Sequence, residues 1–332
     1  MRIAYAQLQQ EFARVLHKNG LTPERAARCA TIFAENSLVG VASHGLNRFP
    51  GLIEFIHKGY VDPNAMCEQV AGLGAWEQWD GGLGVGPLNA YACTERAMAL
   101  AKTHGIGCVG LRNTNHWMRG GYYGWQAAQA GFALLSWTNT KPNVPAWGAT
   151  DCHVGNNPLV LAVPRDDGPV VLDMAMSQFS FGRMETAQRA GQTLPVPGGY
   201  DAAGNLTQEP GAILAANRAL PIGYWKGSGL AMLLDLVAVL LSGGLATHQI
   251  GQQVTEYGVS QVFIAFDVTQ AGGAAFVNQA VEGVIADLHT ATPIDAASAV
   301  LYPGERASQT RADNLANGIP VDPTIWARVQ AM

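Results

Sequence analysis

The sequence predicts an α/β protein in which helices flank a mixed β-sheet and a helical part precedes them. Short apolar runs of strand length alternate with helix-like segments from about residue 76 onward, as in α/β domains. The preceding residues show helical periodicity alone. The dinucleotide fingerprint Gly-x-Gly-x-x-Gly is absent, because Pro87 stands at the third glycine position after Gly82 and Gly84. A standard Rossmann fold is therefore not expected.

Three helices are expected within the first seventy residues. Residues 3–18 carry apolar side chains at helical spacing. Thr22 and Pro23 form a helix start, with a capping hydroxyl followed by proline at the first helical position, and this helix should run to about Leu38. A polar turn then leads into a third helix at residues 52–57.

Strands and helices alternate in the second part of the chain. The predicted strands are residues 76–79, 106–111, 132–137, 158–163, 170–172 and 262–266. The predicted helices are residues 87–104, 122–131, an apolar helix that ends near 241, residues 275–288 and a short terminal helix at 325–329. Residues 179–221 are polar and marked by glycine and proline. A loop of that length indicates either a functional flap or a helix that the periodicity does not show.

Composition limits the function classes. Of the 332 residues, 48% are hydrophobic and only 14% charged, compared with about 25% in typical proteins, which predicts a surface covered by a second copy of the chain. The net charge of -5 and the lack of a basic run argue against nucleic acid and anionic membranes. Five scattered cysteines and an N-terminus without a signal-peptide pattern predict a cytoplasmic protein. The apolar run 230–241 is too short to span a bilayer and contains Asp235.

Several common catalytic motifs are absent from the sequence. Lys226 precedes Gly227-Ser228-Gly229 without the upstream glycine spacing of a phosphate-binding P-loop. No His-Glu-x-x-His, His-x-His or acidic cluster supplies a metal site, and no metal is expected. No Gly-x-Ser-x-Gly turn supplies a nucleophile.

Two histidines in polar, glycine-bordered turns remain as candidates for acid–base chemistry, His44 and His116. Arg48 follows His44 by four residues, so both side chains would share a helical face if a helix begins at Ser43. A histidine that donates a proton beside an arginine that binds a carboxylate suits a 2-oxo acid substrate. The same residues equally suit surface turns and helix caps.

Three further residues suit cofactor contacts. Lys226 precedes an apolar helix, whose free N–H groups attract anions. Asp173 follows a predicted strand, where it can accept ribose hydroxyls or simply end a turn. Trp225 can stack on a base, although packing is the commoner role for tryptophan.

An ordered set of uncommon motifs resembles the malate/L-lactate dehydrogenase family, which lacks a Rossmann fold. The motifs are Ser43-His44-Gly45-Leu46-Asn47-Arg48-Phe49-Pro50, Asn113-Thr114-Asn115-His116-Trp117-Met118-Arg119-Gly120-Gly121, Pro145-Ala146-Trp147-Gly148, Asn157-Pro158-Leu159, Leu194-Pro195-Val196-Pro197-Gly198-Gly199-Tyr200-Asp201 and Gly223-Tyr224-Trp225-Lys226-Gly227-Ser228-Gly229. The resemblance runs over essentially the whole chain.

The resemblance implies a cytoplasmic, homodimeric oxidoreductase that uses NADH, with NADPH possible, to reduce a 2-oxo acid or a 2,3-diketo sugar acid. It implies that His44 is the proton donor and that Arg48 and His116 line the substrate site. The matching cofactor contacts are Pro169, Val170, Val171, Leu172, Asp173, Met174, Ala175, Trp225, Lys226, Gly304, Glu305 and Arg306. Residues 1–73 are expected to form the helical part with 303–332, and residues 74–302 the cofactor-binding α/β domain.

Alternative functions remain open at this stage. The same hydride chemistry could act on malate, L-lactate or a cyclic imino acid. A binding protein for sugar acids without catalysis would also use such a site, although intact His44, His116 and Lys226 motifs speak against it. A zinc lyase is disfavoured because clustered ligands are missing.

Overall fold

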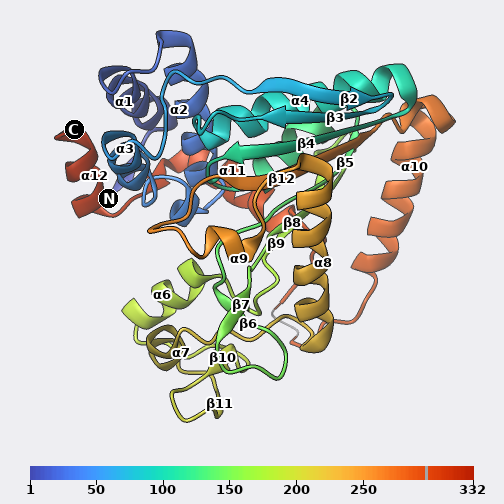
Figure 1. Ribbon diagram of the computed structural model, residues 1–332. Helices are drawn as coiled ribbons and strands as arrows, with labels where there is room; N and C mark the ends of the chain where they lie inside the picture. Colours follow the sequence, from blue (N-terminus) through green and yellow to red (C-terminus); the bar gives the residue numbers. More distant parts are fainter. Residues whose placement is uncertain (296–297) are drawn as a thin grey trace.

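The computed structural model describes residues 1–295 and 298–332, and its centre is a seven-stranded mixed sheet (Figure 1). The strand order is β2-β3-β4-β12-β5-β8-β9. β3 and β4 run parallel, and the other neighbouring pairs run antiparallel. The strands are β2 Glu68–Leu73, β3 Trp76–Asp80, β4 Ile106–Thr114, β5 Ala133–Thr138, β8 Leu159–Val163, β9 Val170–Met174 and β12 Val259–Phe266. The predicted α/β class with a mixed sheet is confirmed.

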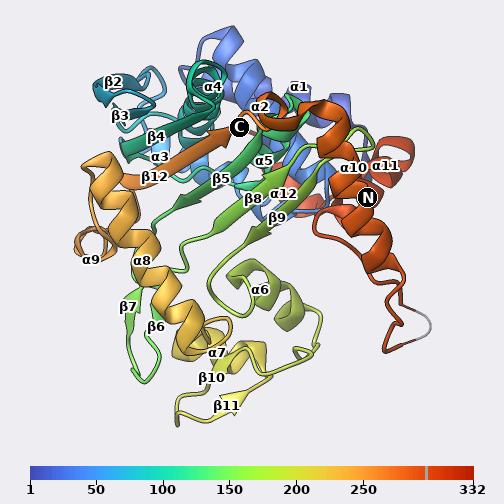
Figure 2. The ribbon, with the colours of Figure 1, turned by 90° about the vertical axis from the view of Figure 1, so that its right-hand side faces the viewer.

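Helices cover both faces of this sheet because consecutive residues of its central strand are apolar and successive side chains point to opposite faces. Phe263 and Ala265 of β12 pack with α4 (Gly86–His104) and α5 (Gly121–Gln129) on one face. Val262 and Ile264 belong to the core on the other face, under α8 (Trp225–Ser242) (Figure 2). The short helix α9 (Thr247–Ile250) connects α8 to β12, and α10 (Thr269–His289) follows β12.

The N-terminal helices and the C-terminal segment share one core. The N-terminal elements are α1 Tyr5–Lys18, α2 Pro23–Leu38, the short 3-10 helix η1 Ala42–His44 and α3 Phe49–His57. The C-terminal elements are α11 Glu305–Asn317 and α12 Pro323–Gln330, and β1 (Arg2–Ile3) pairs with β13 (Ile319–Pro320). In this core the rings of Phe12 and Phe49 stack, and Phe33 meets both of them edge to face. The core also contains Trp326 and Val329.

A smaller unit lies below the sheet in the view of Figure 1. It contains β6 Val144–Pro145, β7 Cys152–Val154, α6 Phe181–Arg189, β10 Gly199–Tyr200, β11 Leu206–Thr207 and α7 Pro210–Ala216. For residues 179–221 the sequence allowed either a functional flap or a helix that the periodicity does not show. The structure contains helices there, and Met184 and Ala187 of α6 pack with Ile213 of α7. Both helices are short, so neither shows a long apolar stripe in the sequence.

Three elements contradict the sequence-based expectations: β1, β2 and α11. The first seventy residues are not all helical, because β1 occupies Arg2–Ile3 and β2 begins at Glu68 and pairs with β3 in the large sheet. All six residues of β2 are exposed, so no apolar alternation marks it. The helix α11 was missed because Asn314 is its single buried residue. We propose the two parts expected above, with β2 reassigned to the sheet; residues 296 and 297 of the α/β range lie outside the described residues.

Within the described residues, α8 alone has the length and mean hydropathy that a membrane span requires. One such helix is weak evidence, because a helix that covers a sheet meets the same criteria. The carboxylate of Asp235 in α8 accepts hydrogen bonds from Asn139 Nδ2 at 2.8 Å and from the Thr247 N–H at 3.0 Å. The inner face of α8 therefore has specific polar anchors as well as apolar contacts.

Candidate active site

His44 lies at the end of a tight turn. η1 ends at His44, and α3 begins one residue after Arg48. The expectation that His44 and Arg48 share one helical face is therefore wrong. Gly45 explains the break, because it lies so close to α2 that a Cβ atom would collide with Ser37 Oγ and with the backbone carbonyl of Phe33. The close approach fixes the turn on α2.

The loop that carries His116 follows β4 and is held by its own polar side chains. The Asn115 amide donates hydrogen bonds to three backbone carbonyl oxygens of neighbouring loops at 2.8–3.1 Å. The Met118 N–H donates to His116 Nδ1 at 2.9 Å. Because Nδ1 accepts this bond, neutral His116 carries its proton on Nε2. The loop therefore presents a fixed tautomer.

The structure brings the two candidate histidines together. The rings of His44 and His116 are nearly parallel, with centroids 5.6 Å apart and planes at 23°. His44 Nδ1 lies 3.2 Å from Ser43 Oγ, a hydroxyl that can either donate to this nitrogen or accept from it. This contact occupies Nδ1 in both protonation states and leaves Nε2 for a substrate.

Electrostatics distinguish the two rings. Burial lowers the pKa of His44, the Asp173 carboxylate opposes that effect, and Arg48 and Arg119 add to it. Burial lowers the pKa of His116 well below its ordinary value, and the charges of Arg48 and His44 lower it further. Among the described residues, a carboxylate raises the pKa of His44 and none raises that of His116, so protonation is easier at His44.

Asp173, at the sheet edge, connects β9 to this cluster. Its Oδ2 accepts a hydrogen bond from the Gly121 N–H at 2.8 Å and lies 3.9 Å from Arg119 Nε. A Cβ atom at position 121 would lie 2.9 Å from Arg119 Nη2 and 3.0 Å from Asp173 Oδ2. Glycine is therefore needed for the carboxylate and the guanidinium to approach each other.

Two charged residues of the site were missed by the sequence analysis. Arg119 is within the quoted motif, but only the structure shows that it faces Asp173. Glu256 lies in a stretch without a motif, so no signal marked it. Its Oε2 accepts a hydrogen bond from the Lys141 N–H at 3.0 Å. Burial raises the pKa of Glu256, while that hydrogen bond and the nearby Arg48 act in the opposite direction.

The predicted cofactor segments meet at the edge strand β9. The Val171 N–H donates to the Pro303 carbonyl at 2.9 Å, and a Cβ atom on Gly304 would lie 3.1 Å from the Val171 nitrogen. The Ile222 N–H donates to the Met176 carbonyl at 2.8 Å, which brings the N-terminus of α8 to the end of β9.

The remaining predicted contacts differ in their surroundings. Trp225 and Lys226 are exposed in the first turn of α8. The Glu305 carboxylate accepts from the Tyr302 N–H at 3.1 Å and lies 3.1 Å from His289 Nε2. Arg306 is exposed on α11.

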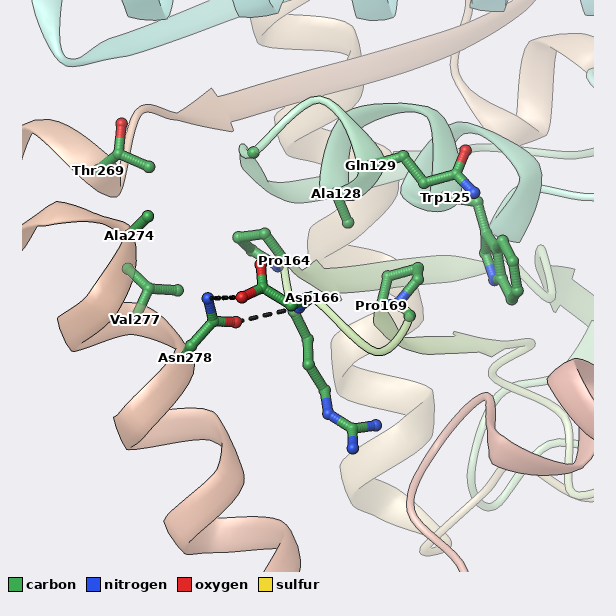
Figure 3. A pocket seen from close by; sticks show the side chains of 13 residues that line it. Trp125, Ala128, Gln129, Pro164, Asp166, Pro169, Thr269, Ala274, Val277 and Asn278 are labelled. Carbon is green, nitrogen blue, oxygen red and sulfur yellow. Dashed lines mark hydrogen bonds between the residues drawn. The ribbon is translucent and has the colours of Figure 1, made fainter.

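A cavity of about 350 Å³ lies away from the histidines, between α5, the β8–β9 turn and α10 (Figure 3). Asn278 Nδ2 donates to Asp166 Oδ2 at 2.6 Å, and the Asp166 N–H donates to Asn278 Oδ1 at 3.0 Å. Pro169 is the one predicted site residue in its wall. The cavity wall contains no histidine and so offers no imidazole for acid–base chemistry. In the described parts of the chain, no three His, Cys, Asp or Glu side chains gather as a metal site.

Comparison with known proteins defines the class to which this fold and site belong. The family model of malate/L-lactate dehydrogenase matches residues 3–330, and the chain belongs to this family. It is an oxidoreductase, and the family's dehydrogenases use a nicotinamide cofactor.

Individual relatives are similar over their full lengths. The chain is 44% identical to 2,3-diketo-L-gulonate reductase of Citrobacter koseri and 45% identical to that of Klebsiella pneumoniae, with 100% of each chain covered. The crystal structure of delta1-piperideine-2-carboxylate reductase from Pseudomonas syringae pv. tomato matches with a TM-score of 0.87 and 28% identity, covering 100% of this chain and 99% of that one.

Proposed function

We propose that this protein reduces 2,3-diketo-L-gulonate, or a closely related 2-oxo or 2,3-diketo sugar acid, with NADH and with His44 as the proton donor. The observation that carries the proposal is the pairing of His44 with a neutral His116 beside Arg48. The names of relatives at 44–45% identity support this substrate.

His44 gives its proton from Nε2 to the carbonyl oxygen of the substrate, while Ser43 holds Nδ1. The Arg48 guanidinium binds the substrate carboxylate, which we expect to contribute about 1.5–3 kcal/mol. His116 Nε2–H donates a hydrogen bond to a substrate oxygen, because its Nδ1 is engaged by the backbone. Asp173 stabilises the charged form of His44 before the proton is transferred.

The residues along β9 and at the start of α8 supply the charged and hydrogen-bonding groups that a bound dinucleotide would need. The exposed Lys226 in the first turn of α8, at the positive end of the helix dipole, suits a diphosphate. Residues 169–175 and 304–306 would hold the rest of the cofactor, with Asp173 as a possible acceptor for a ribose hydroxyl. When bound, the nicotinamide supplies the hydride. The exposed Arg306 would also suit the extra phosphate of NADPH.

The second candidate is the same chemistry on malate, L-lactate or a cyclic imino acid. The likeness to delta1-piperideine-2-carboxylate reductase favours the last of these. Oxidation of NADH and of NADPH should be followed by absorbance with a panel of 2,3-diketo-L-gulonate, oxaloacetate, pyruvate and a cyclic imino acid. We expect the highest kcat/KM with 2,3-diketo-L-gulonate and NADH. A higher kcat/KM with any other member of the panel would reassign the substrate.

We also propose that the chain is a cytoplasmic homodimer that pairs through the outer face of α8. The free thiols of all five cysteines suit a reducing compartment. Large apolar side chains are exposed at helical spacing on α8, among them Leu233 at 53%, Leu236 at 47% and Leu240 at 73%. A contiguous apolar face of this kind marks an interaction surface.

Charge on that face should separate the subunits. Leu233→Glu combined with Leu240→Glu would place two like charges in each half of a symmetric interface. We expect light scattering after size exclusion to give the mass of two chains for the wild type and of one chain for the variant. Leu315→Glu, at an exposed position on α11, serves as the control. A dimer that persists in the double variant would place the interface elsewhere.

A further inference from the structure

A second cavity, of about 260 Å³, lies between α2, α4, α5 and α11. The side chains of its wall that bear on its chemistry are those of Arg28, Glu35, Tyr91, Arg119, Trp125 and Arg311. Neither histidine and none of the proposed cofactor contacts lines it. Drug-sized ligands generally occupy about 300–1,000 Å³, so this cavity suits a smaller molecule.

The wall of this cavity carries more positive than negative charge. Arg28, Arg119 and Arg311 face a single carboxylate, that of Glu35. That carboxylate is occupied, because Arg311 binds both of its oxygens at 3.1 and 3.2 Å. The Arg28 guanidinium lies 4.4 Å from the centre of the Tyr91 ring, and the Glu95 carboxylate acts on the hydroxyl of the same tyrosine from outside the cavity wall. Among the described residues, no carboxylate lies at hydrogen-bond distance from two guanidinium groups of the wall, those of Arg28 and Arg119.

Arg119 gives the strongest indication of a missing partner. Only 8% of this residue is exposed, and its guanidinium makes no hydrogen bond to any residue that the structure describes. Its nearest carboxylate oxygen, on Asp173, is 3.9 Å away, beyond hydrogen-bond distance. A buried cation costs free energy unless it is paired and hydrogen-bonded. The neighbouring Trp125 Nε1 is likewise buried without a partner.

We propose that this cavity binds a small oxyanion, a carboxylate or a phosphate, at a site separate from those of the substrate and the cofactor. The anion accepts hydrogen bonds from Arg119 and is paired with Arg28. Arginine's planar set of N–H donors matches both carboxylate and phosphate oxygens.

The site communicates with catalysis through two charged groups. Arg119 lies between the cavity and Asp173, and Asp173 is the carboxylate that acts on His44. The ring of His44 stacks on that of His116, and the charges that act on it electrostatically are those of Asp173 on β9, Arg48 before α3 and Arg119 of the loop after β4. An anion on Arg119 weakens the effect by which that arginine lowers the pKa of His44. This coupling rests on the proposed function of His44, whereas the binding of the anion does not.

Isothermal titration calorimetry of the full-length protein with inorganic phosphate, and separately with citrate, tests the site. We expect one anion per chain for at least one of the two probes, and the better probe identifies the oxyanion class. Arg28→Gln should weaken binding at least tenfold, and Arg328→Gln, on the exposed side of α12, should not change it. Saturating NADH should leave the anion affinity unchanged. Absence of binding by both probes, or competition with NADH, would overturn the separate site.

The coupling has its own readout. The pH dependence of kcat/KM should be recorded with and without the probe that binds. The alkaline limb of this profile is the fall in kcat/KM as the pH rises above the pKa of His44. We expect this limb to move to higher pH when the anion is present. Arg28→Gln should remove this response while basal activity persists. An unchanged limb at saturating anion would overturn the coupling and leave the binding result intact. A protein without dehydrogenase activity would overturn the proposed function, and the calorimetric result would still decide the anion site.

Discussion

His44→Ala is expected to lower kcat by about 10²–10⁴-fold, the usual contribution of a positioned general acid. The dissociation constant for NADH, measured by fluorescence titration, should stay nearly the same, because the ring is not among the proposed cofactor contacts. The reason is chemical: with Ser43 on Nδ1, the His44 ring is the titratable group whose free nitrogen can protonate a substrate carbonyl.

Two comparisons make this result specific. His104→Ala removes an exposed histidine at the end of α4 and should leave kcat unchanged. His116→Ala should reduce activity mainly through KM, because burial keeps His116 neutral and the Met118 N–H fixes its tautomer, so the ring can only donate a hydrogen bond. Full activity of His44→Ala, or a larger loss of kcat in His116→Ala, would assign the proton donor to a different residue.

Much of the fold could be predicted because its long elements carry their own periodicity. β12 and the helices α2 and α4 are apolar at regular spacing, and their approximate positions follow from that pattern. β2 and α11 could not be found in this way, since their order comes from pairing or packing with distant elements and few of their side chains are buried.

In the candidate site, too, local features could be predicted from the sequence, whereas contacts between distant segments could not. His44 and His116 stand in polar turns bordered by glycine, so each could be selected locally. The sequence does not show that their rings stack, because their contact joins segments more than seventy residues apart. The prediction that His44 and Arg48 share one helical face is wrong, because the packing of Gly45 on α2 interrupts the helix between them. Asp173 was assigned to the cofactor alone, since its approach to Arg119 depends on the absence of a side chain at Gly121.

Asp173→Asn is expected to lower kcat/KM on the order of tenfold near neutral pH, and the loss should grow as the pH rises. Reduction requires protonated His44, so activity falls as the pH passes above the pKa of that ring. Burial, Arg48 and Arg119 all lower this pKa, and the Asp173 carboxylate is the group that raises it. Removing the negative charge leaves the lowering effects unopposed, so the alkaline limb of the pH profile must move to lower pH.

The shape of that profile separates the two roles of Asp173. A pure ribose contact would raise the KM for the cofactor and leave the limb in place, whereas a positioning residue for His44 shifts the limb at saturating cofactor. Asparagine keeps the size of the side chain and can still accept the Gly121 N–H bond, so the local geometry is preserved. Asp287→Asn, at an exposed position on α10, is the matched control. An unshifted limb in Asp173→Asn would restrict this residue to the cofactor.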